Sequence, residues 1–360
     1  MKMNSLLLFP STLCLSLIVN TYGYVYGPVV DRKILYDEQY TTFITCQTAA
    51  TVIRTALKLN IPLESFEIPP RPIMDEDVTY YLFTRKNSNT PDILRSSDSA
   101  GKIKSSNINF KKETVFYIHG YNQTIYNGVS NFTKFLLPKK DVNVIIVNWD
   151  SYATFNLEYS RSITVPRLGE IVGRFVKNLI NAGANPKNIH LIGFSAGGEA
   201  VGLAGKTINP RVGRISAFDP EGSCFNFAPS TQRISKTDAD FVQIVHCSVG
   251  IRALPPYIMG DVTFIMNGGV LQPNCVNETS IMDLGDCSHA QCETFLYETL
   301  TFKGNKSLVG TKCGSFLNYD LNQCDCQDRV QLTYDIPTSL EGLYFINTVS
   351  NKPCGDQKKV

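Results

Sequence analysis

"HLIGFSAGGEA", residues 190–200, is the stretch of sequence that decides the fold. A short apolar run ends here in Ser195, with Gly193 and Gly197 two residues away on either side. A buried strand requires neither glycine, and both glycines disfavour a helix. The pattern suits a sharp reversal between a strand and a helix, because glycines leave room where a Cβ would collide with neighbouring segments. The sequence therefore predicts a strand–turn–helix unit with Ser195 at its apex.

The segments around this unit predict an α/β fold. Apolar, β-branched runs bounded by turn or polar residues indicate buried strands, and apolar residues at helical spacing indicate helices. The predicted strands lie within 114–120, 142–150, 188–195 and 212–220, and the predicted helices within 164–183 and 196–208. Strands that alternate with helices imply a mostly parallel central sheet covered by helices on both faces. We expect one such domain over residues 76–354 and a short tail over 355–360.

The N-terminus predicts export. Residues 1–23 combine an early lysine, an apolar stretch and small residues before a cleavage site after Gly23, as a signal peptide does. A membrane anchor is the alternative, but Pro10, Ser16 and Asn20 interrupt the run that it would require. Residues 24–75 then form a leader of unclear role, either a prosegment or an N-terminal addition. We expect a secreted, extracellular protein without a transmembrane anchor.

Cysteines, sequons and charge agree with that compartment. Removing Cys14 with the signal peptide leaves ten of the eleven cysteines, enough for five disulfides in an oxidising lumen. Sequons at Asn122, Asn131, Asn277 and Asn305 are compatible with glycosylation. The formal net charge of +2, with Lys and Arg scattered, gives no reason to expect a nucleic acid partner. We also expect no cofactor.

Ser195 at a nucleophile turn needs a histidine to accept its proton and an acid to orient that histidine. The chain has four histidines, and the usual order on such a sheet, serine then acid then histidine, removes His119 and His190. His246 ends the strand-like run "DFVQIVH", whereas His289 lies in "GDCSHAQC", which we expect to be a loop fixed by cysteines. We therefore predict His289 as the base and keep His246 as the alternative.

The predicted acid is Asp219. It follows "RISAF" directly at a strand end, where its carboxylate can point toward the same edge of the sheet as Ser195. Asp150 also ends a strand but precedes the serine in the chain, so we expect it to cap a turn. For the oxyanion of ester cleavage, two backbone N–H donors are needed. We predict the N–H groups of Ala196 and Tyr121 for this role.

Taken together, these segments resemble the pancreatic-type lipases, and within them the short arthropod members that include the venom phospholipases A1. The resemblance runs from about residue 78 to the end. It depends on segments that appear in family order: "FYIHGYN", "VIIVNWD", "HLIGFSAGG", "SAFDPEGSCF", "DADFVQIVH", "NGGVLQPNC" and "CSHAQC". The resemblance implies an α/β-hydrolase fold with Ser195, Asp219 and His289 as catalytic residues and donors at Tyr121 and Ala196. It also implies that the C-terminal lipid-binding β-sandwich of the vertebrate enzymes is absent here.

The resemblance further implies a lid over the site, closed by a disulfide between Cys275 and Cys287, and a bridge between Cys313 and Cys324. Six other cysteines cannot be paired from the sequence: Cys46, Cys224, Cys247, Cys292, Cys326 and Cys354. Many family members hold a structural calcium after the acid. Here only Arg233 and Asp238 match, and Ser230 and Ser235 stand where carboxylates are expected, so we expect no metal.

The leading hypothesis is a secreted serine ester hydrolase that acts on lipid at a membrane or micelle surface. Short segments between Cys275 and Cys287 and between His246 and Gly260 favour a phospholipase A1, with a triacylglycerol lipase as the alternative. A non-catalytic lipid-binding or yolk-type protein is a second alternative, and an esterase for small soluble esters is a third. The presence of serine, aspartate and histidine favours an enzyme.

Overall fold

The computed structural model describes residues 68–254, 260–275, 280–301, 308–349 and 353–354, together with residues 46, 48, 51, 52 and 55. The predicted signal peptide and most of the leader lie outside these residues. Within the described part of the chain, no helix is long and apolar enough to cross a membrane.

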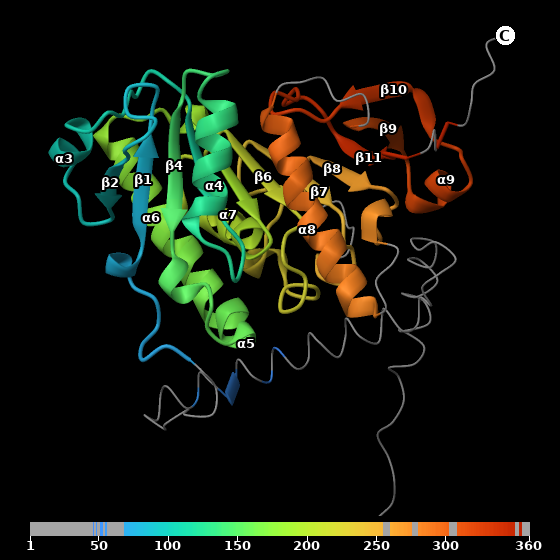
Figure 1. Cartoon of the computed structure of the whole chain (residues 1–360), viewed down its shortest axis with the longest axis horizontal. Coiled ribbons are helices and arrows are strands. Elements are labelled where there is room, and N and C mark those ends of the chain that lie inside the picture. The colour runs from blue at the N-terminus through green and yellow to red at the C-terminus, as the bar shows by residue number, and fades with distance from the viewer. Residues whose placement is uncertain are drawn as a thin grey trace, which may run out of the picture.

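Among the described residues, one sheet of eleven strands organises the fold (Figure 1). Its spatial order is β10-β9-β11-β8-β7-β6-β5-β3-β4-β1-β2. The strands are β1 (Thr79–Phe83), β2 (Asp92–Arg95), β3 (Thr114–Ile118), β4 (Asn143–Asn148), β5 (Ile189–Phe194), β6 (Arg214–Phe218), β7 (Phe241–His246), β8 (Val262–Met266), β9 (Val309–Cys313), β10 (Asp325–Gln331) and β11 (Gly342–Ile346). The run from β4 through β3, β5, β6, β7 and β8 to β11 is parallel. Both edges are antiparallel, with β1 and β2 beside β4 and with β9 and β10 beside β11.

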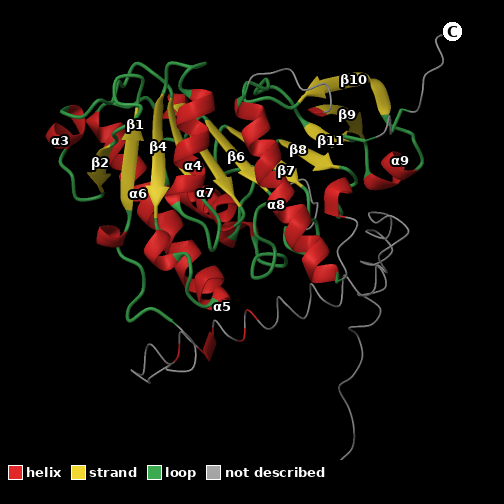
Figure 2. Cartoon of the chain, viewed as in Figure 1, coloured by secondary structure: helices red, strands yellow, loops and turns green. Residues whose placement is uncertain are grey.

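Helices cover both faces of the sheet (Figure 2). They are α3 (Ala100–Lys104), α4 (Ile125–Asn131), α5 (Leu157–Tyr159), α6 (Val165–Ala182), α7 (Ala196–Thr207), α8 (Ile281–Leu300) and α9 (Phe316–Asp320). Successive side chains of a strand point to opposite faces, so β3 contributes to two apolar cores. Phe116 and Ile118 join the core that contains residues of α6 and α7, while Val115 and Tyr117 join the core that contains residues of α8.

Glycines allow α6 and α7 to pack closely. A Cβ at Gly169 would lie 2.6 Å from the Leu203 Cβ, and one at Gly173 would lie 1.9 Å from the Thr207 Oγ1. Neither position could hold a larger residue without moving the helices apart. Because α7 starts at the residue after Ser195, this contact fixes the helix that follows the predicted turn.

The structure confirms the predicted strands and helices at the centre of the sheet, but the prediction omitted other strands. The four predicted strands correspond to β3, β4, β5 and β6, and the two predicted helices to α6 and α7. The sequence motifs did not mark β2, β8, β9 or β10 as strands. β10 is the edge strand and has no fully buried residue, and β9 beside it contains Gly310 and Lys312, so neither has the continuous apolar run of the central strands.

Ten cysteines form five disulfides among the described residues. Those that sequence could not pair are joined as Cys46–Cys224, Cys247–Cys292 and Cys326–Cys354. Cys275 is bonded to Cys287 and Cys313 to Cys324, as the resemblance implies. Cys46 belongs to the segment assigned to the leader, yet its side chain is buried. Its disulfide to Cys224 connects that segment to the loop after β6.

Candidate active site

Ser195 stands at a strained turn between β5 and α7. Its backbone has φ 56° and ψ −123°, a conformation that a residue with a side chain adopts only when its surroundings hold it there. The flanking glycines explain how. A Cβ at Gly193 would lie 2.1 Å from the Gly197 carbonyl oxygen, and a Cβ at Gly197 would lie 2.1 Å from the Ile118 carbonyl oxygen. The sequence pattern around Ser195 is therefore a steric requirement of this turn.

The structure brings together the three residues predicted as a triad. The Ser195 Oγ lies 2.7 Å from the His289 Nε2, and the His289 Nδ1 lies 2.6 Å from the Asp219 Oδ2. Ser195 follows β5 and Asp219 follows β6, the neighbouring strand, so parallel pairing delivers both side chains to the same edge of the sheet.

The prediction that His289 lies in a loop is wrong. His289 lies in α8, which begins at Ile281 and continues to Leu300. The helix starts where Ser280 caps it, accepting a hydrogen bond from the Asp283 N–H. Spaced cysteines in the sequence suggested a cross-linked loop, but Cys287 and Cys292 lie on the helix itself and connect it to its surroundings.

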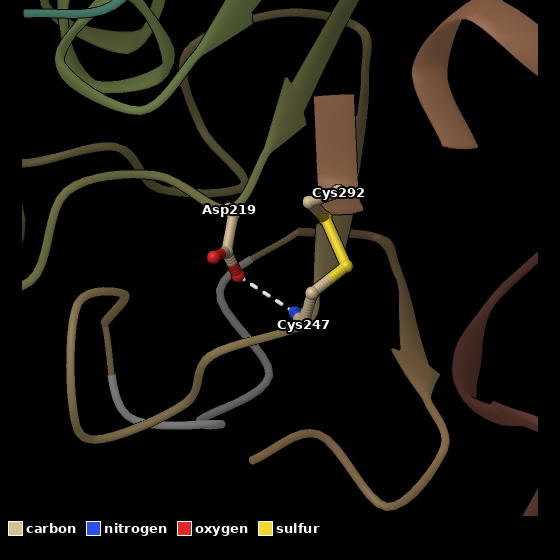
Figure 3. Close-up of side chains that lie close together, drawn as sticks. All are labelled: Asp219, Cys247 and Cys292. Atoms are coloured by element: carbon tan, nitrogen blue, oxygen red, sulfur yellow. Dashed lines mark hydrogen bonds between the residues drawn. A yellow bond between two sulfur atoms is a disulfide. The ribbon is translucent and has the colours of Figure 1, made fainter. Parts of the chain in front are cut away.

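Asp219 is fully buried and is held by four hydrogen bonds. Its Oδ1 accepts from the N–H groups of Cys247 at 2.7 Å and Ser248 at 3.1 Å, and its Oδ2 accepts from the Ser248 hydroxyl and from His289. Figure 3 shows the bond from Cys247, whose disulfide to Cys292 lies beside the carboxylate. Sequence reasoning missed Ser248, and only its position directly after Cys247 at the end of β7 hinted at it.

These contacts set the ionisation of the pair. Burial by itself raises the pKa of Asp219, but the hydrogen bonds from His289, Ser248 and Cys247 outweigh it and hold the pKa below its usual value. Burial likewise lowers the pKa of His289, but the bond to Asp219 and its negative charge outweigh that effect and raise the pKa. The carboxylate therefore stabilises a protonated His289 and fixes its Nδ1 as the donor to Asp219.

The other acid and histidines lie in different surroundings. His246, the alternative base, is fully buried, neither ring nitrogen has a hydrogen-bond partner among the described residues, and burial lowers its pKa to about 4. His190 bonds the Ser216 hydroxyl at 2.8 Å. Asp150 accepts the Ile125 N–H at 3.1 Å at the start of α4 and lies 2.9 Å from the His119 Nε2. Asp150 therefore caps a helix, in line with the prediction for it.

The predicted oxyanion donors come from two adjoining turns. Ala196 is the first residue of α7, where backbone N–H groups have no partner within the helix. Tyr121 follows Gly120, and a Cβ at Gly120 would lie 3.0 Å from the Ser195 Cβ, so this loop passes directly beside the serine. Tyr121, Ser195 and His289 all line one cavity of about 390 Å³.

Two ion pairs that sequence reasoning did not single out also line this cavity. The Arg161 guanidinium lies 3.0 Å from Glu221, and both side chains are nearly buried. Arg252 donates to Asp286 at 2.8 Å, and that carboxylate is more than half exposed. Glu221 follows Asp219 by two positions, which was the available signal; Arg161 is distant in sequence and gave none.

The site of the family's structural calcium does not fit a metal in this chain. The Lys206 ammonium pairs with the Asp238 carboxylate and donates to the Ser235 hydroxyl at 3.1 Å. Asp238 is thus neutralised by a side chain, and the serine offers a neutral oxygen where calcium prefers carboxylates. Elsewhere in the described residues, Asp219, Cys247 and Cys292 lie close enough to suggest a metal site, but the two cysteines are bonded to each other (Figure 3).

Comparison with known proteins places the chain among lipases. Residues 46–353 match the family model described as Lipase. Lipase member H-A of Xenopus laevis is 32% identical over 260 residues, covering 71% of this chain and 55% of the relative. The pancreatic triacylglycerol lipase of Homo sapiens is 30% identical over 269 residues, covering 69% and 57%. Among solved structures, a phospholipase/carboxylesterase from Dyadobacter fermentans is 14% identical with a TM-score of 0.33, covering 42% of this chain and 74% of that one.

The chain spans little more than half the length of these two lipases. The family model nevertheless covers most of it, and its first matched residue is Cys46, the cysteine that ties the leader segment to Cys224. With its α/β-hydrolase fold and this match, the chain belongs to the lipase family.

Proposed function

We propose that this protein is a secreted serine hydrolase that cleaves carboxylic esters of lipids. The observation that carries the proposal is the continuous hydrogen-bonded series from Ser195 through His289 to the buried Asp219. A serine hydroxyl attacks an ester carbonyl only when a base removes its proton, and this arrangement supplies the base and orients it.

In the proposed reaction, His289 Nε2 accepts the proton of Ser195 as its oxygen attacks the substrate carbonyl. Asp219 keeps the His289 Nδ1 proton in place and stabilises the positive charge that forms on the ring. The N–H groups of Tyr121 and Ala196 stabilise the oxyanion. His289 then returns its proton to the leaving alcohol, and water hydrolyses the acyl-enzyme by the same sequence of steps.

For the substrate, we propose a phospholipid cleaved at sn-1, which makes the enzyme a phospholipase A1. Cys275 and Cys287 are only 12 positions apart, and the second half of that loop is the first part of α8. The loop between the two cysteines therefore leaves little chain for an apolar lid that could cover three acyl chains. Residues 276–279 of this loop, and residues 255–259, lie outside the described residues. A phospholipid keeps its charged head group near water, which a small lid and the Arg252–Asp286 pair, whose carboxylate is exposed, accommodate.

The resemblance to short arthropod lipases and venom phospholipases A1 supports the same choice, while the relatives include a protein named pancreatic triacylglycerol lipase. A triacylglycerol lipase is therefore the second candidate. Both share the family's lipid substrate, and they differ in whether a charged head group remains at the mouth of the cavity.

The test is hydrolysis by the purified protein of mixed micelles that contain either phosphatidylcholine or triolein. We expect faster release of the sn-1 fatty acid of phosphatidylcholine. A strong preference for triolein would reject the lid argument while leaving the proposed triad intact. A small-ester esterase would show no rate increase when its substrate passes from monomers to micelles. A lipid-binding protein would bind the micelles and release no fatty acid.

We also propose that residues 1–23 are a signal peptide, that the hydrolase domain covers 76–354, and that residues 24–75 are attached to it through Cys46. The five disulfides support an oxidising compartment. N-terminal sequencing of the secreted protein tests the cleavage after Gly23 and the retention of residues 24–75. If both hold, the protein has one N-terminus, at residue 24.

A further inference from the structure

We propose that Glu293 is a positioning residue for the oxyanion loop, which comprises residues 119–123, and that it acts through Gln123. In this arrangement α8 carries the base and also fixes the loop that supplies an oxyanion donor. The inference rests on the proposed hydrolase function and adds a role that neither the triad nor the family match assigns.

A short series of hydrogen bonds links α8 to the loop. Glu293 lies one helical turn after His289 and lines the same cavity as Ser195. Its Oε2 accepts from the Gln123 Nε2 at 2.7 Å, and the Gln123 Oε1 accepts from the Gly120 N–H at 2.8 Å. The Gln123 amide therefore has a donor and an acceptor role that are both fixed by its neighbours.

The other carboxylate oxygen of Glu293 is also occupied. It accepts from the Tyr117 hydroxyl at 3.0 Å and from the Tyr297 hydroxyl. Burial, together with the charge of Glu293, raises the pKa of both tyrosines, so both keep their protons as donors. Tyr117 comes from β3 and Tyr297 from α8, so the carboxylate is held by the sheet and its own helix and cannot follow the loop if the loop moves.

The bond to Gly120 matters because the next peptide along the chain carries the proposed oxyanion donor, the Tyr121 N–H. The Gly120 carbonyl oxygen lies 3.0 Å from the His119 Nδ1, and the Tyr121 N–H belongs to the same trans peptide and so points the opposite way. The Gly120 N–H belongs to the peptide before Gly120, and Gln123 holds it. The Gly120 carbonyl belongs to the peptide after it, and His119 lies against that oxygen. The two contacts therefore fix both peptides that flank Gly120, and the second of these carries the proposed oxyanion donor.

The tolerance at this point is small. A Cβ at Gly120 would lie 3.0 Å from the Ser195 Cβ and 3.3 Å from the Gln123 Oε1, so the loop is packed between the nucleophile and its support. A displacement of about 1 Å in a catalytic arrangement costs about 10²-fold in rate, and losing an oxyanion donor costs about 10²- to 10³-fold. Releasing Gln123 should therefore affect the chemical step more than substrate binding.

A polarity swap tests this role. In Gln123→Glu, the new carboxylate can still accept the Gly120 N–H, but its second oxygen faces the Glu293 carboxylate and the two repel. In the double variant Gln123→Glu/Glu293→Gln, the amide donates in the reverse direction and its oxygen accepts from the two tyrosines. The donor–acceptor pattern is then complete again, with the same number of charges as in the wild type.

Hydrolysis of a soluble p-nitrophenyl ester gives kcat and KM separately, and thermal unfolding of each variant gives the midpoint. We expect Gln123→Glu to lower kcat about 10- to 100-fold with KM changed by less than about threefold. We expect the double variant to return kcat to within about threefold of the wild type. The exposed Gln327→Glu on β10 is the matched control and should change neither.

An unchanged kcat in Gln123→Glu would overturn the inference. A double variant that recovers the unfolding midpoint but not kcat would also overturn it, because the contact would then be structural only. If Gln123→Glu fails to fold, the double variant still decides by the same comparison with the wild type. A wild type that hydrolyses no ester would instead overturn the proposed function, whereas an active wild type with indifferent variants overturns this inference alone.

Discussion

Replacing Asp219 with Asn tests how the proposed triad depends on its buried carboxylate. The asparagine oxygen can keep the bonds from the N–H groups of Cys247 and Ser248, which are 2.7 and 3.1 Å long in the wild type. Its amide N–H₂ must then face the His289 Nδ1, which lies 2.6 Å from the present carboxylate oxygen. Two donors cannot meet at that distance, so the proton of His289 moves to Nε2, where it faces Ser195.

The consequence for activity is large and the consequence for folding is small. With the proton on Nε2, His289 cannot accept the proton of Ser195, and a reversal of this kind in a serine–histidine–aspartate triad costs about 10⁴-fold in kcat. That corresponds to about 5.5 kcal/mol of transition-state stabilisation. Most backbone bonds to residue 219 survive, so the unfolding midpoint should fall by only a few degrees, in keeping with the loss of about 1 kcal/mol from one buried hydrogen bond.

The assay is kcat on a soluble ester, with Asp240→Asn as the control. Asp240 pairs with Lys187 at the surface just before β7, and losing that pair should leave kcat unchanged. An Asp219→Asn variant that folds and keeps more than about a tenth of wild-type kcat would refute the proposed role of the carboxylate. The thermal unfolding curve of Asp219→Asn distinguishes a folded but inactive variant from one that has failed to fold.

Three further predictions follow from the same contacts. Activity should rise with pH through the pKa of His289, which lies above its usual value. The variant His289→Ala should lose all hydrolysis, whereas His246→Ala should lose much less. The opposite order of the two variants would mean that the base is misassigned. Burial raises the pKa of Glu199 from 4.5 to about 8, so between these pH values the folded state holds a proton that the unfolded state releases, and stability falls as pH rises. Glu199→Gln should therefore raise the unfolding midpoint at pH 7 by the equivalent of at most about 3 kcal/mol, with little change near pH 4. An equal effect at both pH values would contradict this. Peptide mapping without reduction should recover Cys275 and Cys287 in one cross-linked product, and a free thiol at either position would remove the argument for a short lid.

The centre of the fold and the turn that carries Ser195 could be predicted because their signals are local, and the sequence also named the other two residues of the proposed triad. Gly193 is required by a contact within the turn and Gly197 by a contact with the end of β3, but both glycines mark the turn in the sequence. β-Branched runs mark strands that are buried on both faces. Asp219 was selected by its position at a strand end. Chain order left His246 and His289 as candidate bases, and His289 was preferred because a loop was expected there; the structure places it in α8. The two strand ends that carry Ser195 and Asp219 are neighbours in the sheet, and so the prediction needed only parallel pairing.

The remaining features depend on contacts between distant segments. Glu293 and Gln123 are 170 positions apart, and neither stands out until α8 is placed over β3. The segment that carries His289 is predicted as a loop because of its closely spaced cysteines, whereas it is part of α8. Disulfide pairing failed for a related reason: Cys46 and Cys224 are 178 positions apart, and spacing alone gives no preference among the possible partners.

The most direct test of the proposed hydrolase is to find the residue that forms the covalent intermediate. The purified protein is treated with an alkyl phosphonate that mimics the tetrahedral intermediate of ester cleavage, and the adduct is located by peptide mass spectrometry. We predict a single adduct on Ser195, formed in proportion to the loss of activity and absent from His289→Ala on the same time scale. Complete inhibition with the adduct on another residue, or with Ser195 unmodified, would contradict the account.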